Sequence, residues 1–158
     1  MDAAVSETLY RAADAAYDAG EYATALRLFA QCVDLGESAA MTRLAIMHEL
    51  GQGTPADIEA SIAWDLKAID AGSRASTFNI ATTYRRCGEI RAARHWFERA
   101  LDAGYGEAAI ELAKLYSVSD READTAKDYL RRALAFDDLL EDDRAEAQDL
   151  LARDLSDW

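Results

Sequence analysis

Residues 40–72 read AMTRLAIMHELGQGTPADIEASIAWDLKAIDAG, two apolar stretches joined by a loop that holds two glycines and the only proline of the chain. Small and bulky apolar residues on each side of the loop are spaced by three, four and seven positions, which is the period of one helical stripe. Gly72 follows the second stretch, where glycine commonly ends a helix. The stretch therefore predicts a helical hairpin.

The same pattern recurs along the chain. The turn residues Gly36, Gly72, Gly104 and Asp137 follow one another at intervals of 36, 32 and 33. The position eleven residues before each turn residue is small, and the position eight before it is bulky: Ala25, Ser61, Ala93 and Ala126, and Leu28, Trp64, Trp96 and Tyr129. Self-similarity at this period indicates an array of repeats.

A further helix is predicted upstream of each of these, with an alanine at its close-packing position: Ala13, Ala45, Ala81 and Ala113. All eight glycines fall at inferred turns, and valine and isoleucine are scarce, which favours helix over strand. We predict an all-α fold, an α-solenoid of four helical hairpins with a C-terminal capping helix. The predicted repeats cover about residues 7–37, 38–73, 74–105 and 106–137, and the capping helix covers 138–158.

The loop in the quoted stretch is an enlarged hairpin loop. The first helix's alanine and the second helix's small residue are 12 positions apart in the first and third units and 16 apart in the second. Thr54 fits a helix cap, Pro55 a first helical residue, and Asp57 a negative charge in the first turn. We expect the second helix of this hairpin to begin at Pro55.

These residues resemble a known family. The segment from Ala40 to Gly72 is similar to a Sel1-like repeat (SLR) at Leu44, Ala45, Gly51, Gly53, Asp57, Trp64, Lys67, Ala68 and Gly72. The first and third units look more like its shorter relative, the tetratricopeptide repeat (TPR): Gly20, Tyr22, Ala25, Phe29 and Cys32, then Tyr84, Gly88, Ile90, Ala93, Phe97 and Ala100. The resemblance implies an α-solenoid that binds proteins, without implying a particular partner.

The sequence departs from the family pattern at two places. His48 stands where a tyrosine is usual, and the segment SVSDRE at 117–122 lacks the glycine expected in its loop. These departures bear on the loop geometry of the fourth unit more than on the fold.

Composition and charge exclude several classes of protein. A formal net charge of −13 repels phosphate backbones and anionic lipid, so we expect no nucleic-acid ligand. The start MDAAVSETLY has neither a basic leader nor an apolar segment, and no apolar run approaches the ~20 residues of a membrane span. We expect one cytoplasmic domain over residues 1–158, with no membrane contact and with Cys32 and Cys87 as reduced thiols.

No constellation of residues points to catalysis. His48 and His95 are too few and too isolated for a metal site or a catalytic triad. Trp64 and Trp96 occupy a repeat position that predicts core packing rather than ligand binding. We predict a non-enzymatic protein with no catalytic residues, no metal and no cofactor.

What remains is the outward side of the first helix in each hairpin, which lines the concave groove in proteins that this one resembles. Outward positions spaced by four then three give the predicted partner-binding residues Tyr10, Asp14, Tyr17, Ile46, Glu49, Phe78, Thr82, Arg85 and Lys114. Arg86 is added as a cation that would orient an acidic segment together with Arg85 and Lys114. Thr42, Ile110 and Ser117 share the outward spacing. The carboxylate clamp of some chaperone-binding TPR proteins is disfavoured, because Tyr10 and Asp14, or Thr42 and Ile46, stand where that clamp needs lysine and asparagine.

Two charged segments leave alternatives open. Residues 74–99 hold six arginines and two glutamates, which either pair with local acids or bind an acidic or C-terminal peptide segment. Residues 137–158 hold nine acids and two arginines and end in Trp158. This tail either caps the array, joins copies head to tail, or neutralises a basic partner. We therefore predict a protein–protein interaction module, an adaptor or scaffold, with an acidic immunity-type inhibitor or chaperone as the alternative.

Overall fold

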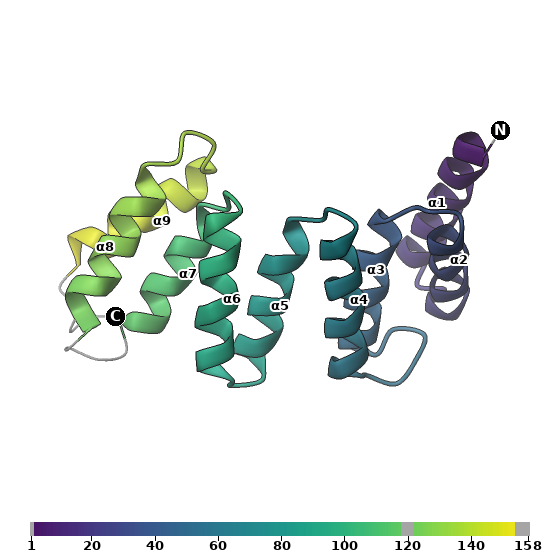
Figure 1. The fold of residues 1–158 in the computed structure, drawn as a ribbon, viewed down its shortest axis with the longest axis horizontal. Helices are drawn as coiled ribbons and strands as arrows, with labels where there is room; N and C mark the ends of the chain where they lie inside the picture. The colour runs from purple at the N-terminus through teal and green to yellow at the C-terminus, as the bar shows by residue number, and fades with distance from the viewer. Residues whose placement is uncertain (1, 118–121, 154–158) are drawn as a thin grey trace. The chain divides into compact units, whose positions relative to one another are not determined.

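The computed structural model describes residues 2–117 and 122–153, and within them the chain is all-α, with nine helices and no strand (Figure 1). The helices are α1 Asp2–Asp18, α2 Tyr22–Asp34, α3 Ala39–Leu50, α4 Ile58–Asp70, α5 Ala75–Arg86, α6 Ile90–Asp102, α7 Glu107–Tyr116, α8 Ala123–Leu134 and α9 Glu141–Ala152. The predicted fold class is confirmed. Of the unit-four segment SVSDRE, residues 118–121 lie outside the described residues, and Ser117 and Glu122 flank α7 and α8.

The chain divides into two compact units, Met1–Thr83 and Tyr84–Trp158, and the division falls within α5. In the first unit α1 packs on α2, α2 on α3, and α3 on α4. In the second unit α6 packs on α7, α7 on α8, and α9 on both α7 and α8. α1 and α2, α3 and α4, and α7 and α8 thus form hairpins, as predicted. That residues 1–158 act as one domain with the predicted repeat bounds remains a prediction.

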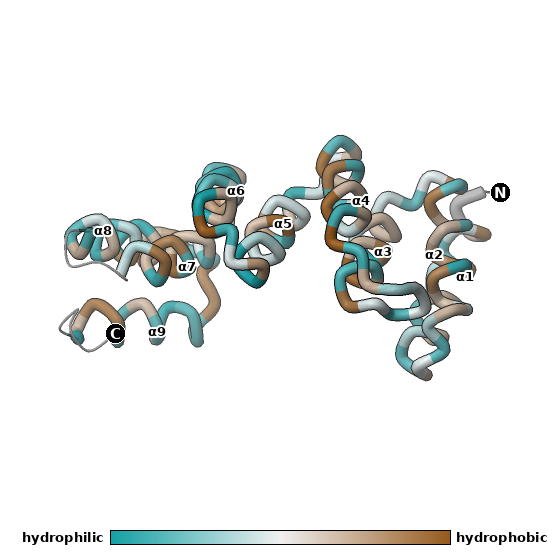
Figure 2. Tube along the Cα trace, turned by 90° about the horizontal axis from the view of Figure 1, so that it is seen from below, coloured by the Kyte–Doolittle hydropathy of each residue, from teal (hydrophilic) through white to brown (hydrophobic). Residues whose placement is uncertain are grey.

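Small residues let the helices approach closely. The predicted close-packing positions are all buried: Ala13, Ala45, Ala81 and Ala113 on the first helices, and Ala25, Ser61, Ala93 and Ala126 on the second. Figure 2 shows apolar and polar residues alternating along the helices, as expected for elements that bury one side. The glycines fall between helices, and seven of the eight have positive φ.

The bulky core position lies one residue later than predicted. Trp64 and Trp96 are only half-buried, as are Leu28 and Tyr129 at the equivalent positions. The next residue in each second helix is buried instead: Phe29, Asp65, Phe97 and Leu130. Trp64 packs against the core of the first unit, as predicted, but only from its edge. One residue turns a helix by about 100°, so the fully buried stripe runs through the neighbouring position.

A cation lies over each of the half-buried aromatic rings. Lys67 Nζ is 4.2 Å from the centre of the Trp64 ring, and the Arg99 guanidinium is 4.3 Å from that of Trp96. These residues are three positions apart on one helix, which brings their side chains together. Cation–π contact thus covers the outer side of rings that the core leaves exposed.

The enlarged loop caps α4 differently from the prediction. The cap is Asp57, whose extended backbone aims a carboxylate oxygen at the Ala60 N–H, 2.9 Å away. Thr54 and Pro55 lie in the loop, so their assignment to the helix start is wrong. Aspartate is among the strongest capping residues, since its charge also favours the helix N-terminus.

Candidate partner-binding face

Seven of the ten predicted partner-binding residues belong to the first unit, and all seven are half-buried: Tyr10, Asp14 and Tyr17 on α1, Ile46 and Glu49 on α3, and Phe78 and Thr82 on α5. We call these seven residues the first-helix face. Its tyrosines are held by the core beneath, because the Tyr10 ring meets Phe29 edge-on at 5.5 Å between centres. Tyr17 meets Tyr22 in the same way, also at 5.5 Å.

Arg43 of α3 joins the three α1 residues of this face, and sequence reasoning missed it. Its guanidinium forms an ion pair with Asp14 at 3.1 Å and lies 5.7 Å from the centre of the Tyr17 ring. A hydrogen bond to Tyr10, with the charge of Asp14, raises the pKa of Arg43. The sequence did hold a signal for this contact. Arg43 directly follows Thr42, an outward position of α3, and Asp14 is an outward acid on the first helix of the preceding hairpin.

Polar side chains connect α3 and α5 within the same unit. Thr83 Oγ1 donates to Glu49 Oε1 at 3.1 Å, and the hydroxyls of Thr42 and Ser76 lie 3.2 Å apart. Glu49 is therefore held by a neighbouring first helix rather than by solvent alone. These bonds fix the spacing of α3 and α5 beneath the face.

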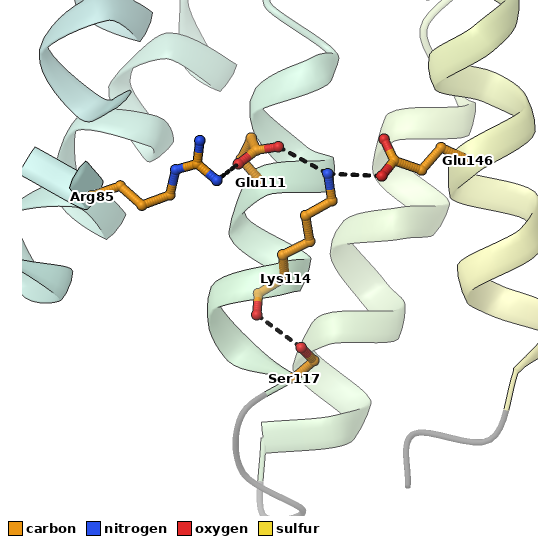
Figure 3. A network of polar contacts seen from close by, with 5 residues as sticks. All are labelled: Arg85, Glu111, Lys114, Ser117 and Glu146. Carbon is orange, nitrogen blue, oxygen red and sulfur yellow. Dashed lines mark hydrogen bonds and ion pairs between the residues drawn. The ribbon is translucent and has the colours of Figure 1, made fainter. Parts of the chain in front are cut away.

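In the second unit, the predicted cations Arg85 and Lys114 belong to a network of ion pairs (Figure 3). Arg85 lies 2.9 Å from Glu111, and Lys114 lies 3.0 Å from Glu111 and 2.8 Å from Glu146 of α9. The interpretation that the arginines of residues 74–99 pair with local acids thus holds for Arg85, and Lys114 is paired as well. Arg86 is exposed at the end of α5.

The electrostatics of Lys114 reflect this network. Partial burial would lower its pKa, but hydrogen bonds to Glu146 and Glu111 outweigh that effect, and the pKa is raised. Lys114 therefore carries its charge at neutral pH. Ile110, expected to face outward beside it, is buried, because α6, α8 and α9 all pack on α7.

Nothing in the described ranges 2–117 and 122–153 forms a group of three or more histidine, cysteine or acidic residues that could hold a metal ion. Cys32 is buried, and burial raises the pKa of its thiol, which keeps it protonated and unreactive. Cys87 is exposed. Over those same ranges, the structure contains no helix with the length and apolar content that crossing a membrane requires.

Comparison with known proteins supports the repeat assignment. A family model for the Sel1 repeat matches residues 38–73 and 89–105. The second match falls in the unit whose sequence looks more like a TPR. None of the curated proteins compared with the chain matches it.

Two solved structures share the fold. A Sel1 repeat protein from Oxalobacter formigenes is similar with a TM-score of 0.68 and 21% identity, over 92% of this chain and 62% of that one. A protective antigen of uropathogenic Escherichia coli that displays an SLR fold is similar with a TM-score of 0.55 and 23% identity, over 70% of this chain and 25% of that one. The chain thus spans less than two thirds of the length of either protein. The chain thus matches the Sel1 repeat model over these two segments and shares its arrangement of helical hairpins with solved structures that have the SLR fold.

Proposed function

We propose that this protein is a non-enzymatic interaction module that binds a partner peptide or protein on its first-helix face. The proposal is supported by the ordered, partly exposed aromatic side chains of that face in the first unit. Tyr10, Tyr17 and Phe78 are half-buried aromatic residues, and the core or a neighbouring ring holds the two tyrosines in place. Pre-ordered aromatic side chains bind with a small loss of entropy and are frequent anchors of interfaces.

The charges of the face bear on what it would bind. Asp14 and Arg43 neutralise each other, and in the second unit Arg85 and Lys114 are paired with Glu111 and Glu146. An acidic segment that used these cations would have to replace the acids already present. We therefore expect apolar and aromatic contacts to dominate the affinity, with Arg85, Arg86 and Lys114 contributing to orientation.

The test is affinity capture from the native host with the wild-type chain and two matched variants, read by quantitative mass spectrometry. Replacing Ile46 and Phe78 with serine removes two apolar side chains from the face, and we expect it to reduce capture of the specific partner at least tenfold. Leu66→Ser removes an exposed apolar side chain from α4, outside the face, and should leave capture unchanged. Equal capture by all three chains would refute the proposed face.

The alternative is an acidic inhibitor or chaperone that neutralises a basic protein. Its support is α9, whose first turn carries Glu141, Asp142 and Asp143. Acids at a helix N-terminus also stabilise the helix itself, so they do not require a partner. Salt separates the two candidates: capture through exposed charges should weaken steeply between about 0.1 and 0.5 M salt, and capture through aromatic contacts should not.

A further inference from the structure

A buried carboxylate occupies a core position of the second repeat. Asp65 is 2% exposed, and it lies seven residues before a turn residue. The equivalent residues of the other repeats are Phe29, Phe97 and Leu130, all buried and apolar. A carboxylate at such a position carries a large desolvation cost unless other groups satisfy it.

The groups that face Asp65 come from two other helices of the first unit. From α5, the neutral side chains of Ser76 and Asn79 form hydrogen bonds with it. From α3, the charged group near it is Glu49, which also accepts the hydrogen bond from Thr83. Within the described part of the chain, Asp65 Oδ1 has no hydrogen-bond partner. We call these five residues the polar seam.

Two members of the polar seam, Ser76 and Thr83, occupy positions that are apolar in the first helices of the neighbouring repeats. Ser76 corresponds to Ala40 of α3 and Ala108 of α7, both buried. Thr83 corresponds to the buried Met47 and Leu115. Apolar burial holds the other first helices at these two positions, whereas α5 adds to its buried Ile80 and Ala81 polar contacts with α3 and α4 whose strength depends on charge.

Ionisation of Asp65 works against this contact. Burial raises its pKa from an ordinary 3.8 to about 6, the charge of Glu49 adds to the rise, and the hydrogen bonds from Ser76 and Asn79 oppose it. Because the folded-state pKa lies above the unfolded one, the stabilisation is complete below about pH 4 and is lost as the pH rises through about 6.

We propose that the polar seam is a proton-controlled contact, in which protonated Asp65 holds α5 against α3 and α4 and ionised Asp65 loosens it. α5 also carries Phe78 and Thr82 of the first-helix face. Resting on the proposed function, we infer that protonation orders part of the partner-binding face, so that partners bind more tightly in mildly acidic solution.

The test is hydrogen exchange of the full chain at about pH 5 and pH 8, corrected for the intrinsic rate at each pH, with α8 as the internal reference. In the wild type, we expect the protection of α5 relative to α8 to fall at least tenfold at the higher pH. Asp65→Asn, a neutral side chain of the same shape, should keep high protection at both pH values. Asp70→Asn, which removes an exposed charge from the same helix, should behave as the wild type does.

The wild-type measurement decides the proposal even if Asp65→Asn does not fold. A ratio of α5 to α8 protection that is the same at both pH values would overturn it, as would a pH-dependent ratio retained in a folded Asp65→Asn. Partner capture at the two pH values tests the inferred effect on binding separately. If capture does not depend on Ile46 and Phe78, the proposed function fails while the exchange result still stands.

Discussion

Gly53 illustrates how one residue ties two repeats together. Its φ of 78° lies in the left-handed region, and a Cβ added there would be 2.5 Å from the carbonyl oxygen of Tyr22, at the start of α2. The enlarged loop of the second repeat therefore lies directly against the first repeat. Only glycine allows both the conformation and the approach.

Replacing Gly53 with alanine should lower the free energy of unfolding more than replacing Gly20. Gly20 has a similar φ of 75°, but nothing lies within 4 Å of an added Cβ. Gly20→Ala should cost about 1–2 kcal/mol of conformational strain, and the clash with Tyr22 should add about 1–3 kcal/mol for Gly53→Ala. Urea unfolding of both variants measures the difference, and equal losses would show that the loop moves away without cost.

Among the helices of the second unit, a stack of three side chains joins α6, α7 and α8. The Arg94 guanidinium lies 3.9 Å from the centre of the Tyr116 ring, which stacks on Tyr129 with 5.4 Å between centres and 18° between planes. The Arg132 guanidinium lies 5.1 Å from the centre of the Tyr129 ring. Burial, with Glu98 and Tyr116 nearby, raises the pKa of Tyr129 to about 12, so its ring stays neutral.

A double-mutant cycle tests this stack. Tyr116→Leu and Tyr129→Leu should each destabilise the second unit, and together they should cost about 1 kcal/mol less than the sum of their separate effects. Tyr129→Phe is the control, since it keeps the ring and removes only the hydroxyl that donates to Glu98 at 3.3 Å. Strict additivity in urea unfolding would mean that the rings contribute through burial alone.

At the scale of the whole molecule, α9 closes the second unit. Leu139 and Ala147 are buried, and Arg144 donates to the carbonyl oxygens of Leu134 and Phe136 at 3.1 and 2.7 Å. Leu134 is the last residue of α8, and Phe136 follows the helix. Carbonyl groups at the end of a helix have no hydrogen-bond partner within it, so Arg144 satisfies acceptors that the helix leaves unpaired. The described part of the acidic segment thus packs on the end of the second unit, as a capping helix would. The alternative in which the segment joins copies through Trp158 rests on residues outside those described.

Ending the chain after Asp137 should destabilise the second unit and leave the core of the first unchanged. Loss of the buried apolar contacts should cost about 2–4 kcal/mol, which hydrogen exchange would detect as lower protection of α7 and α8 but not of α1 and α2. Glu146→Gln is the control, because it removes only the partly exposed pair with Lys114 and should cost less than about 1 kcal/mol. Capture that survives the truncation would argue against the acidic-inhibitor alternative.

Much of the architecture was predictable from the sequence, for a local reason. Glycines at regular intervals end helices, and alanines such as Ala13 and Ala45 mark where two helices approach, so helix number and hairpin order follow from short-range pattern. The candidate face was predictable only as a stripe of outward positions. Spacing could not reveal that Arg43 pairs with Asp14, since ion pairs between helices depend on the angle at which the helices pack.

The amino-acid sequence was enough to predict the resemblance to Sel1 repeats, the all-α class and the order of the helices, because each follows from the period of small residues and turns. Tertiary structure alone decided that Asp57 caps α4, that Trp64 and Trp96 lie at the edge of the core, and that Asp65 lies inside it. A periodic pattern defines which residues share a stripe on a helix. Which residues of that stripe are fully buried, and which lie at the edge of the core, is decided only when neighbouring helices pack, since burial depends on side chains distant in sequence.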